Sequence, residues 1–231
     1  MTYSHVLKLR MQKTKPNGVG RRERRKKETR QQIFQAAMKL FERKGIFSTT
    51  VEEITDAADV GKGTFFNYFP SKEAILSVMA ERQMGIVERA AEKARSAASI
   101  HPVLKEMLQE LCAAPGRSQI MLRSLLGMVL SNKMLFETFS HVLQEGRKRL
   151  AAIIERGQQI GEVRRDIPAI ELARCLHQAA FGTSFIWAIS PPSDLIAWQE
   201  QSMDLFWRGI AVNPDQVSQQ SVTHEETAAR Q

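Results

Sequence analysis

The chain has only two cysteines among its 231 residues, and it has no long uninterrupted run of apolar residues. Cys112 and Cys175 do not have the spacing of metal ligands or of a disulfide framework. We expect both to be buried thiols in a reducing compartment. No apolar run approaches the ~18 residues that a membrane-spanning helix needs, and no apolar stretch follows the basic N-terminus as it would in a secretory signal. We therefore expect a cytoplasmic protein that does not enter a membrane.

Motifs of the common enzyme classes are also missing from the sequence. It contains no nucleophile elbow, P-loop, dinucleotide fingerprint or cluster of metal-ligating side chains. Gly61-Lys62-Gly63-Thr64 superficially resembles a phosphate loop, but it lacks the preceding strand and the earlier glycine. We predict that the protein is not an enzyme and that it has no catalytic residue, metal site or cofactor.

The net charge of the chain is +8, and the positive charge is concentrated near the N-terminus. Residues 1–27 carry ten basic residues and one acid, or +9, while the other 204 residues carry 23 basic and 24 acidic residues, or −1. Dense charge with few apolar residues predicts that 1–27 is a disordered arm. Such an arm either tracks DNA phosphates or the minor groove, or is a solvated tail without a partner.

The remainder of the chain has helical periodicity and no alternating pattern that demands a strand. Apolar residues from Ile33 to Phe41 follow helical spacing, and Gly45 supplies a stop after Lys44. We therefore predict an all-α fold, followed by a disordered polar tail over residues 212–231. The predicted helices are 28–44, 50–58, 62–68, 72–97, 101–113, 117–130, 132–158, 168–189 and 192–210.

Residues 46–70 predict a helix-turn-helix. Thr50 and Glu53 have the spacing of a capping box at the start of the first helix, and Asp59-Val60-Gly61 forms the turn. In the second helix Phe65 and Phe69 lie four residues apart and face inward. In a helix-turn-helix the second helix lies in the DNA major groove and contacts base edges with its N-terminal residues.

Eight residues are candidates for contacts with DNA. Glycines at the start of the second helix allow close approach of the backbone, whose free amides favour phosphate. Lysine, threonine and asparagine side chains suit phosphates or base edges, and an aromatic ring packs on sugar or on a thymine methyl group. A half-buried core position is the alternative for the tyrosine. The candidates are Thr50, Lys62, Gly63, Thr64, Phe66, Asn67, Tyr68 and Lys72.

This region resembles the TetR family of transcriptional regulators. The resemblance covers about residues 28–76 and is carried by Phe41-Glu42-Arg43-Lys44-Gly45, by Thr49-Thr50-Val51-Glu52-Glu53-Ile54 and by the run from Ala57 to Glu73. Phe66 departs from the family, which often has a tyrosine there, so one hydroxyl contact is missing. The resemblance implies a three-helix DNA-binding domain over residues 28–75 and a helical-bundle ligand-binding and dimerisation domain over residues 76–211.

The same resemblance implies a homodimeric repressor that a small-molecule effector releases from its operator. A pocket in a helical bundle is mostly apolar, although methionine and aromatic residues at helical spacing are usually core. His177 differs from these because it is polar within a helix rich in alanine and phenylalanine. The pocket candidates are Met121, Leu125, Met128, Phe136, Phe139, His177, Phe181 and Phe185.

Two stripes on the last two helices are candidates for the dimer interface. Four such helices, two from each subunit, would form a self-complementary contact, and each stripe has the subunit's own core as its alternative. A two-fold dimer predicts a palindromic operator. The interface candidates are Ala173, Ala180, Ser184, Ala188, Leu195, Trp198, Ser202, Leu205 and Phe206.

Two other functions remain open at this point. A DNA-binding protein without an inducer, such as a chromosome-organising factor, would use the same helix-turn-helix. An RNA or membrane-surface binder would use the basic arm, but that arm has no aromatic residue between Lys8 and Lys27 and no amphipathic apolar face of consequence. The expected partners are an operator in double-stranded DNA, a second copy of the chain and an unknown effector, in the nucleoid of the cytoplasm.

Overall fold

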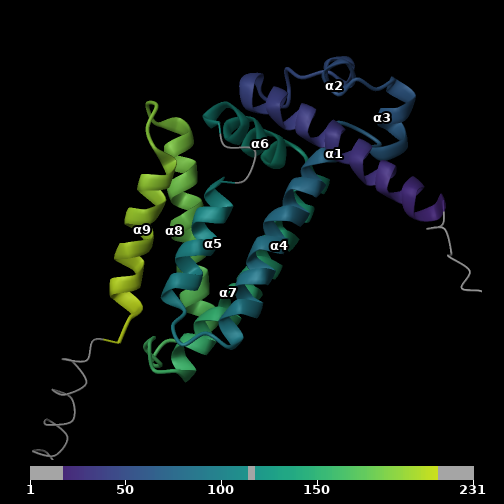
Figure 1. Ribbon diagram of the computed structural model, residues 1–231. Helices are drawn as coiled ribbons and strands as arrows, with labels where there is room; N and C mark the ends of the chain where they lie inside the picture. The colour runs from purple at the N-terminus through teal and green to yellow at the C-terminus, as the bar shows by residue number, and fades with distance from the viewer. Residues whose placement is uncertain (1–17, 114–117, 213–231) are drawn as a thin grey trace, which may run out of the picture.

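The computed structural model describes residues 18–113 and 118–212, and the all-α prediction is confirmed for them. Within these residues no helix is both long and apolar enough to cross a membrane. An isolated bridge pairs Val163 with Ala211. The helices of the described residues (Figure 1) are α1 Gly18–Lys44, α2 Val51–Ala57, α3 Lys62–Tyr68, α4 Ile75–Arg95, α5 His101–Ala113, α6 Gln119–Ser131, α7 Lys133–Gln159, α8 Ala169–Ile189 and α9 Leu195–Ile210.

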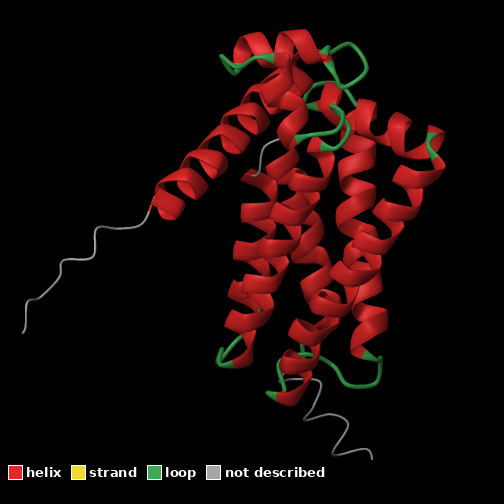
Figure 2. Cartoon of the chain, turned by 90° about the vertical axis from the view of Figure 1, so that its right-hand side faces the viewer, coloured by secondary structure: helices red, strands yellow, loops and turns green. Residues whose placement is uncertain are grey.

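Helices α1, α2 and α3 form a head at one end of the molecule, and the long helices α4, α5, α7, α8 and α9 form a bundle beneath it (Figure 1, Figure 2). The head has its own hydrophobic core, in which Phe34, Phe41, Ile54 and Phe65 are completely buried or nearly so. Burial of these large apolar side chains holds the seven-residue helices α2 and α3 against α1, because helices as short as α2 and α3 are not stable alone.

Helix α4 belongs to both cores. Its first turns, with Ile75 and Met79, pack into the head, whereas Ile86, Ala90 and Ala94 pack into the core of the bundle. Since one continuous helix supplies side chains to both cores, a tilt of α4 must move the head relative to the bundle.

Helix α6 makes a second connection, on the other side of the head. The Ser118 hydroxyl caps α6 by accepting the Met121 N–H at 3.0 Å, and it donates to the Glu42 carbonyl near the end of α1 at 2.5 Å. The Ser124 hydroxyl oxygen accepts the backbone N–H of Ile46 at 2.9 Å. Two serines of α6 therefore hold the C-terminal end of α1.

The opposite side of α6 is bonded to the C-terminal end of α8. Gln119 Nε2 donates to the Trp187 carbonyl at 2.7 Å, and Arg123 Nη1 donates to the Ala188 carbonyl at 2.6 Å. Carbonyls at the end of a helix have no partner within the helix, so these side chains satisfy α8 while joining it to α6.

The helix boundaries largely match those expected, and the clearest difference is at α1. This helix begins at Gly18, so residues 18–27, expected to belong to a disordered arm, are helical. Arginine and lysine are good helix formers, and no glycine or proline interrupts residues 21–44. The expectation of disorder rested on charge density, which does not outweigh this helix propensity here. Residues 1–17 and 213–231 lie outside the described residues.

The expectation of two buried thiols is wrong for one cysteine. Cys112 is buried in the bundle, but Cys175 is exposed on α8. The side of α8 that faces the core is occupied by Leu172 and Leu176, which are both buried, and Cys175 lies on the side turned away from them.

Candidate nucleic-acid interface

The capping box expected at the start of α2 is present. The Thr50 hydroxyl oxygen accepts the Glu53 N–H at 3.2 Å, and Glu53 Oε2 accepts the Thr50 N–H at 2.9 Å. Lys44, at the end of α1, pairs with the other carboxylate oxygen of Glu53. The bond from Lys44, followed by the Thr50 amide, lowers the pKa of Glu53 from its ordinary 4.5 to about 2. Glu53 thus ties the start of α2 to the end of α1.

The turn between α2 and α3 is fixed by backbone bonds and by one residue in the left-handed region. Asp59 has a φ of 52°, a conformation that aspartate tolerates better than most residues. The Val60 N–H then reaches back to the Thr55 carbonyl at 3.0 Å. Phe65 and Phe69 face the core of the head as expected, so α3 has one fixed orientation.

The face of α3 opposite those two phenylalanines is open to solvent. Lys62, Gly63 and Asn67 are exposed, and the Phe66 ring is 53% exposed although it lies edge-on to Phe65. A side chain at Gly63 would meet no other atom within 4 Å. The structure therefore gathers most of the expected DNA contacts on one accessible face, with Thr64 and Tyr68 half-buried at its border.

Two of the expected phosphate contacts already have partners within the head. Lys62 pairs with Glu52 of α2, and its bond lowers the pKa of that carboxyl. Both side chains of this pair are 57% exposed, and an exposed ion pair is weak because water and salt screen it, so a phosphate can compete for Lys62. The Thr50 hydroxyl also donates to Glu53 at 3.1 Å, so a phosphate would have to replace that bond.

Lys72 has a different role from the one expected. Its ammonium group donates to the carbonyls of Ile46, Phe47 and Thr49 at 2.9, 3.2 and 2.6 Å. An ammonium group has three donors, and all three are directed into the loop between α1 and α2. Lys72 is therefore withdrawn as a phosphate contact: it binds the loop that leads into α2 to the segment that follows α3.

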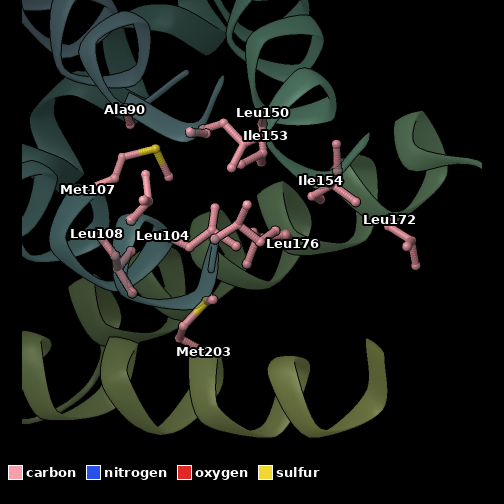
Figure 3. Packing of buried hydrophobic residues seen from close by; sticks show 14 of the residues in the cluster. Ala90, Leu104, Met107, Leu108, Leu150, Ile153, Ile154, Leu172, Leu176 and Met203 are labelled. Atoms are coloured by element: carbon pink, nitrogen blue, oxygen red, sulfur yellow. The ribbon is translucent and has the colours of Figure 1, made fainter. Parts of the chain in front are cut away.

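Within the bundle, a small apolar cavity lies between α4, α5, α7, α8 and α9. Its volume is about 100 Å³. Six of its lining side chains, from α5, α7, α8 and α9, converge in Figure 3. Burial, followed by the nearby charge of Arg147, lowers the pKa of His177. The lining residues are Val87, Leu104, Met107, Leu108, Leu111, Gly146, Leu150, Leu176, His177, Ala180 and Met203.

Of the eight expected pocket residues, only His177 lines this cavity. Met121 and Met128 are buried in the core of the head, and Leu125 packs against the same core, because α6 turns its apolar face toward α1. Phe139 and Phe181 pack on each other with ring centroids 6.0 Å apart. Phe136 and Phe185 are 51% and 41% exposed. These seven residues are therefore withdrawn as lining of this cavity.

The expected interface stripes are divided between the core and the surface. Ala173, Ala188 and Leu195 are buried within the subunit, and Ala180 lines the cavity. Ala173, Ala188 and Leu195 are withdrawn from the interface, because side chains buried in their own subunit have no surface to offer a partner. Half-buried Ala180 is assigned to the cavity instead. The Ser184 hydroxyl accepts from Gln199, and Phe206 packs against the bundle core.

A different set of α8 and α9 residues faces solvent. Phe185, Ile186 and Ile189 of α8 are 41–60% exposed, and Leu205 of α9 is 64% exposed. A shallow surface hollow between the two helices is lined by Gly182, Thr183, Ile186, Trp198, Gln201 and Ser202. The candidates Trp198, Ser202 and Leu205 thus remain on an apolar surface, together with the α8 isoleucines that sequence reasoning missed.

Residues 33–79, which contain this helix-turn-helix, match the family model "Bacterial regulatory proteins, tetR family". This segment of the chain is therefore similar to the TetR family of transcriptional regulators. The transcriptional regulator TcmR of Streptomyces glaucescens is 45% identical over 60 residues, which are 26% of this chain and 26% of TcmR. The chain thus matches about a quarter of the length of that relative.

Two other similar proteins are matched over most of their length. The "Fatty acid metabolism regulator protein" of Bacillus subtilis (strain 168) is 27% identical over 186 residues, covering 78% of this chain and 94% of that protein. The structure of Thermus thermophilus FadR, a TetR family repressor in complex with lauroyl-CoA, is 28% identical, covers 80% of this chain and 96% of that one, and has a TM-score of 0.56.

The bonds of Glu53 predict how the stability of the protein depends on pH. A carboxyl whose pKa is lower in the folded state stabilises that state only when ionised. Its contribution is complete above 4.5 and is lost as the pH falls toward about 2. As the pH falls from 4.5 to about 2, the free energy of unfolding of Glu53→Gln, measured in urea, should therefore decrease less than that of wild type. Glu88→Gln, at an exposed position of α4, is the matched control; parallel pH curves for wild type and Glu53→Gln would contradict the assignment.

Proposed function

We propose that the protein is a homodimeric repressor that reads a palindromic operator through α3 and leaves it when an effector enters the bundle. The observation that carries the proposal is the exposed face of α3, held in one orientation by buried Phe65 and Phe69. On that face Gly63, Asn67 and Phe66 offer an open backbone, an amide for base edges and an apolar ring. Such a face suits the major groove.

The apolar surface of α8 and α9 supports the dimer. Ile186, Ile189 and Leu205 are each more than half exposed, and large apolar side chains grouped on a surface mark sites of association. Trp198 and Gly182 line the hollow between the two helices, which gives the surface both a depression and projecting side chains. A two-fold contact requires such self-complementarity. It would place two copies of α3 about one DNA turn apart, ~34–36 Å.

The cavity supports the effector site. Its volume of about 100 Å³ is below the ~300–1,000 Å³ that encloses a typical ligand, so an effector must push the lining side chains apart. Met107 and Met203 are flexible enough to yield. Val87 of α4 also lines the cavity, and α4 supplies Ile75 to the core of the head. Expansion of the cavity therefore displaces the helix that holds the head.

An effector can shift this equilibrium only by binding the DNA-incompetent arrangement more tightly than the DNA-competent one. Separation of α4 from α8 supplies that difference, because α6 holds the end of α1 to the end of α8 through Arg123 and Ser124. When α4 moves and α6 does not, the head must rotate between its two attachments. The spacing of the two α3 helices then departs from one DNA turn.

The chemistry of the cavity favours an effector that is mostly apolar with one polar end. His177 is the polar group in the lining, and Arg147, which lowers the pKa of His177, has a buried Nε without a hydrogen-bond partner. Since a relative is a fatty acid metabolism regulator and FadR binds lauroyl-CoA, a long acyl chain is the first effector class to test. A second candidate function is that of a DNA-binding regulator without an effector, and the small volume of the cavity favours it.

Selection of bound sequences from a random duplex library, with the full-length protein at near-physiological salt, tests the central proposal. We expect a palindromic consensus with half-sites one helical turn apart, because a two-fold dimer presents two identical α3 helices. The mass of the complex should correspond to two chains on each duplex. Diffuse, salt-sensitive binding without a consensus would reject a sequence-specific repressor.

Substitutions on α3 test the contacts one at a time. Asn67→Ala and Phe66→Ala should each weaken binding to the selected operator by about 1–3 kcal/mol, roughly 5–150-fold, which is the usual value of a base contact. The Asn67 side chain is exposed, so its loss should leave the thermal unfolding midpoint unchanged, whereas loss of the Phe66 ring, which lies edge-on to Phe65, should lower it slightly. Gln144→Ala, at an exposed position of α7, should do neither. Unchanged affinity in both α3 variants would show that this face does not read DNA.

A substitution that fills the cavity separates effector binding from DNA binding. Ala180→Leu adds three carbon atoms at a position that lines the cavity, so the variant should bind the operator normally but resist release by a compound that releases wild type. Lauroyl-CoA and lauric acid are the first probes, and Lys105→Leu, on the exposed side of α5, is the control. Equal release of Ala180→Leu and wild type would place the effector elsewhere, and no release of wild type by any compound would favour the regulator without an effector.

A further inference from the structure

The first ten residues of α1 form a helix that contributes nothing to the core of the head. The core begins at Ile33, and residues 20–28 are all exposed. Residues 18–27 contain six basic residues and one acid, so this segment, called the basic extension below, carries a net charge of +5. No apolar residue interrupts the run from residue 20 to 28.

Within a free subunit these charges repel one another. Arg21 and Arg25, and likewise Arg22 and Lys26, lie four residues apart on one helix face, where like charges are destabilising. One exposed pair, Arg24 with Glu28 at 3.5 Å, opposes this repulsion. A helix that is polar on every side does not gain stability from packing, so the basic extension suits a partner with a high density of negative charge.

The basic extension lies beside the reading helix. The Arg30 guanidinium is 5.6 Å from the centre of the Phe69 ring, so α1 passes the C-terminal end of α3 at that point. Upstream of Arg30 the helix continues past α3 and away from the bundle, as both views show (Figure 1, Figure 2). At ~1.5 Å per residue, ten residues extend ~15 Å.

From this placement we infer that the basic extension is a second DNA-binding element, which grips phosphates outside the half-site read by α3. A length of ~15 Å corresponds to about four base pairs at ~3.4 Å each. Phosphate contacts carry no direct sequence information, so the extension lengthens the required duplex without lengthening the consensus. This inference rests on the proposed function, because it needs an operator bound by α3.

Duplex trimming tests the inference with the full-length protein and the selected operator. Wild type should bind less tightly when about four base pairs are removed from each end beyond the half-sites, and the slope of log affinity against log salt should become shallower by about 0.9 for each phosphate that the protein no longer neutralises. A variant with glutamine at six positions should show the shallower slope on both duplexes and should be indifferent to trimming. The six positions are Arg21, Arg22, Arg24, Arg25, Lys26 and Lys27.

Glutamine is nearly as good a helix former as arginine and lysine, so the variant keeps its helix, which circular dichroism checks. A matched control removes six exposed cations from the bundle by substitution with glutamine, and this variant should remain sensitive to trimming like wild type. The six control positions are Lys93, Arg95, Lys105, Lys133, Lys148 and Arg208.

The possible outcomes separate this inference from the proposed function. If the extension variant retains the wild-type salt slope and trimming effect while α3 still selects the operator, the basic extension does not bind DNA and only this inference fails. If that variant loses the consensus itself, the extension reads bases rather than phosphates, and the inference is again overturned. If wild type selects no sequence at all, the proposed function fails first.

Discussion

The structure depends on one helix that is shared between two hydrophobic cores. Ile75 and Met79 of α4 are packed in the head, and Ala90 and Ala94 are packed in the bundle. Close packing makes both ends resistant to local adjustment, so α4 has to move as a unit. The helix-turn-helix is fixed internally by the capping box of Thr50 and Glu53, by the ammonium group of Lys72 and by the buried phenylalanines of α3. It therefore follows α4 as a rigid body.

Helix α6 makes the attachment of the head two-sided. Ser118 and Ser124 bind the end of α1, while Gln119 and Arg123 bind the end of α8. A head held by α4 alone would swing freely in any direction, whereas a head held at two places can turn only about the line that joins them. The small volume of the cavity agrees with this arrangement, since a nearly closed bundle keeps α4 and α8 close together.

Sequence reasoning succeeded where the determining interactions are local. The capping box, the inward phenylalanines and the helices α2, α3 and α5 depend on residues a few positions apart, so their pattern is visible in the chain. It failed where the partner is distant in sequence. Lys72 meets carbonyls 23–26 residues away, and Met121 and Met128 face α1 rather than a pocket. The periodicity of α6 shows that the helix has an apolar side, but it does not determine which neighbouring helix that side packs against. His177 could be recognised from the sequence because it is a polar residue in an otherwise apolar helix.

The cavity and the exposed face of α3 have no residue in common. Five helices line the cavity, whereas the exposed face belongs to one short helix. Under the proposed function, changes at lining positions such as Ala180 or Met107 after a gene duplication would give the two copies different effectors while both kept the same operator. Changes at Asn67 would do the reverse. On that proposal, the architecture lets a lineage change what it senses and what it controls as two independent traits.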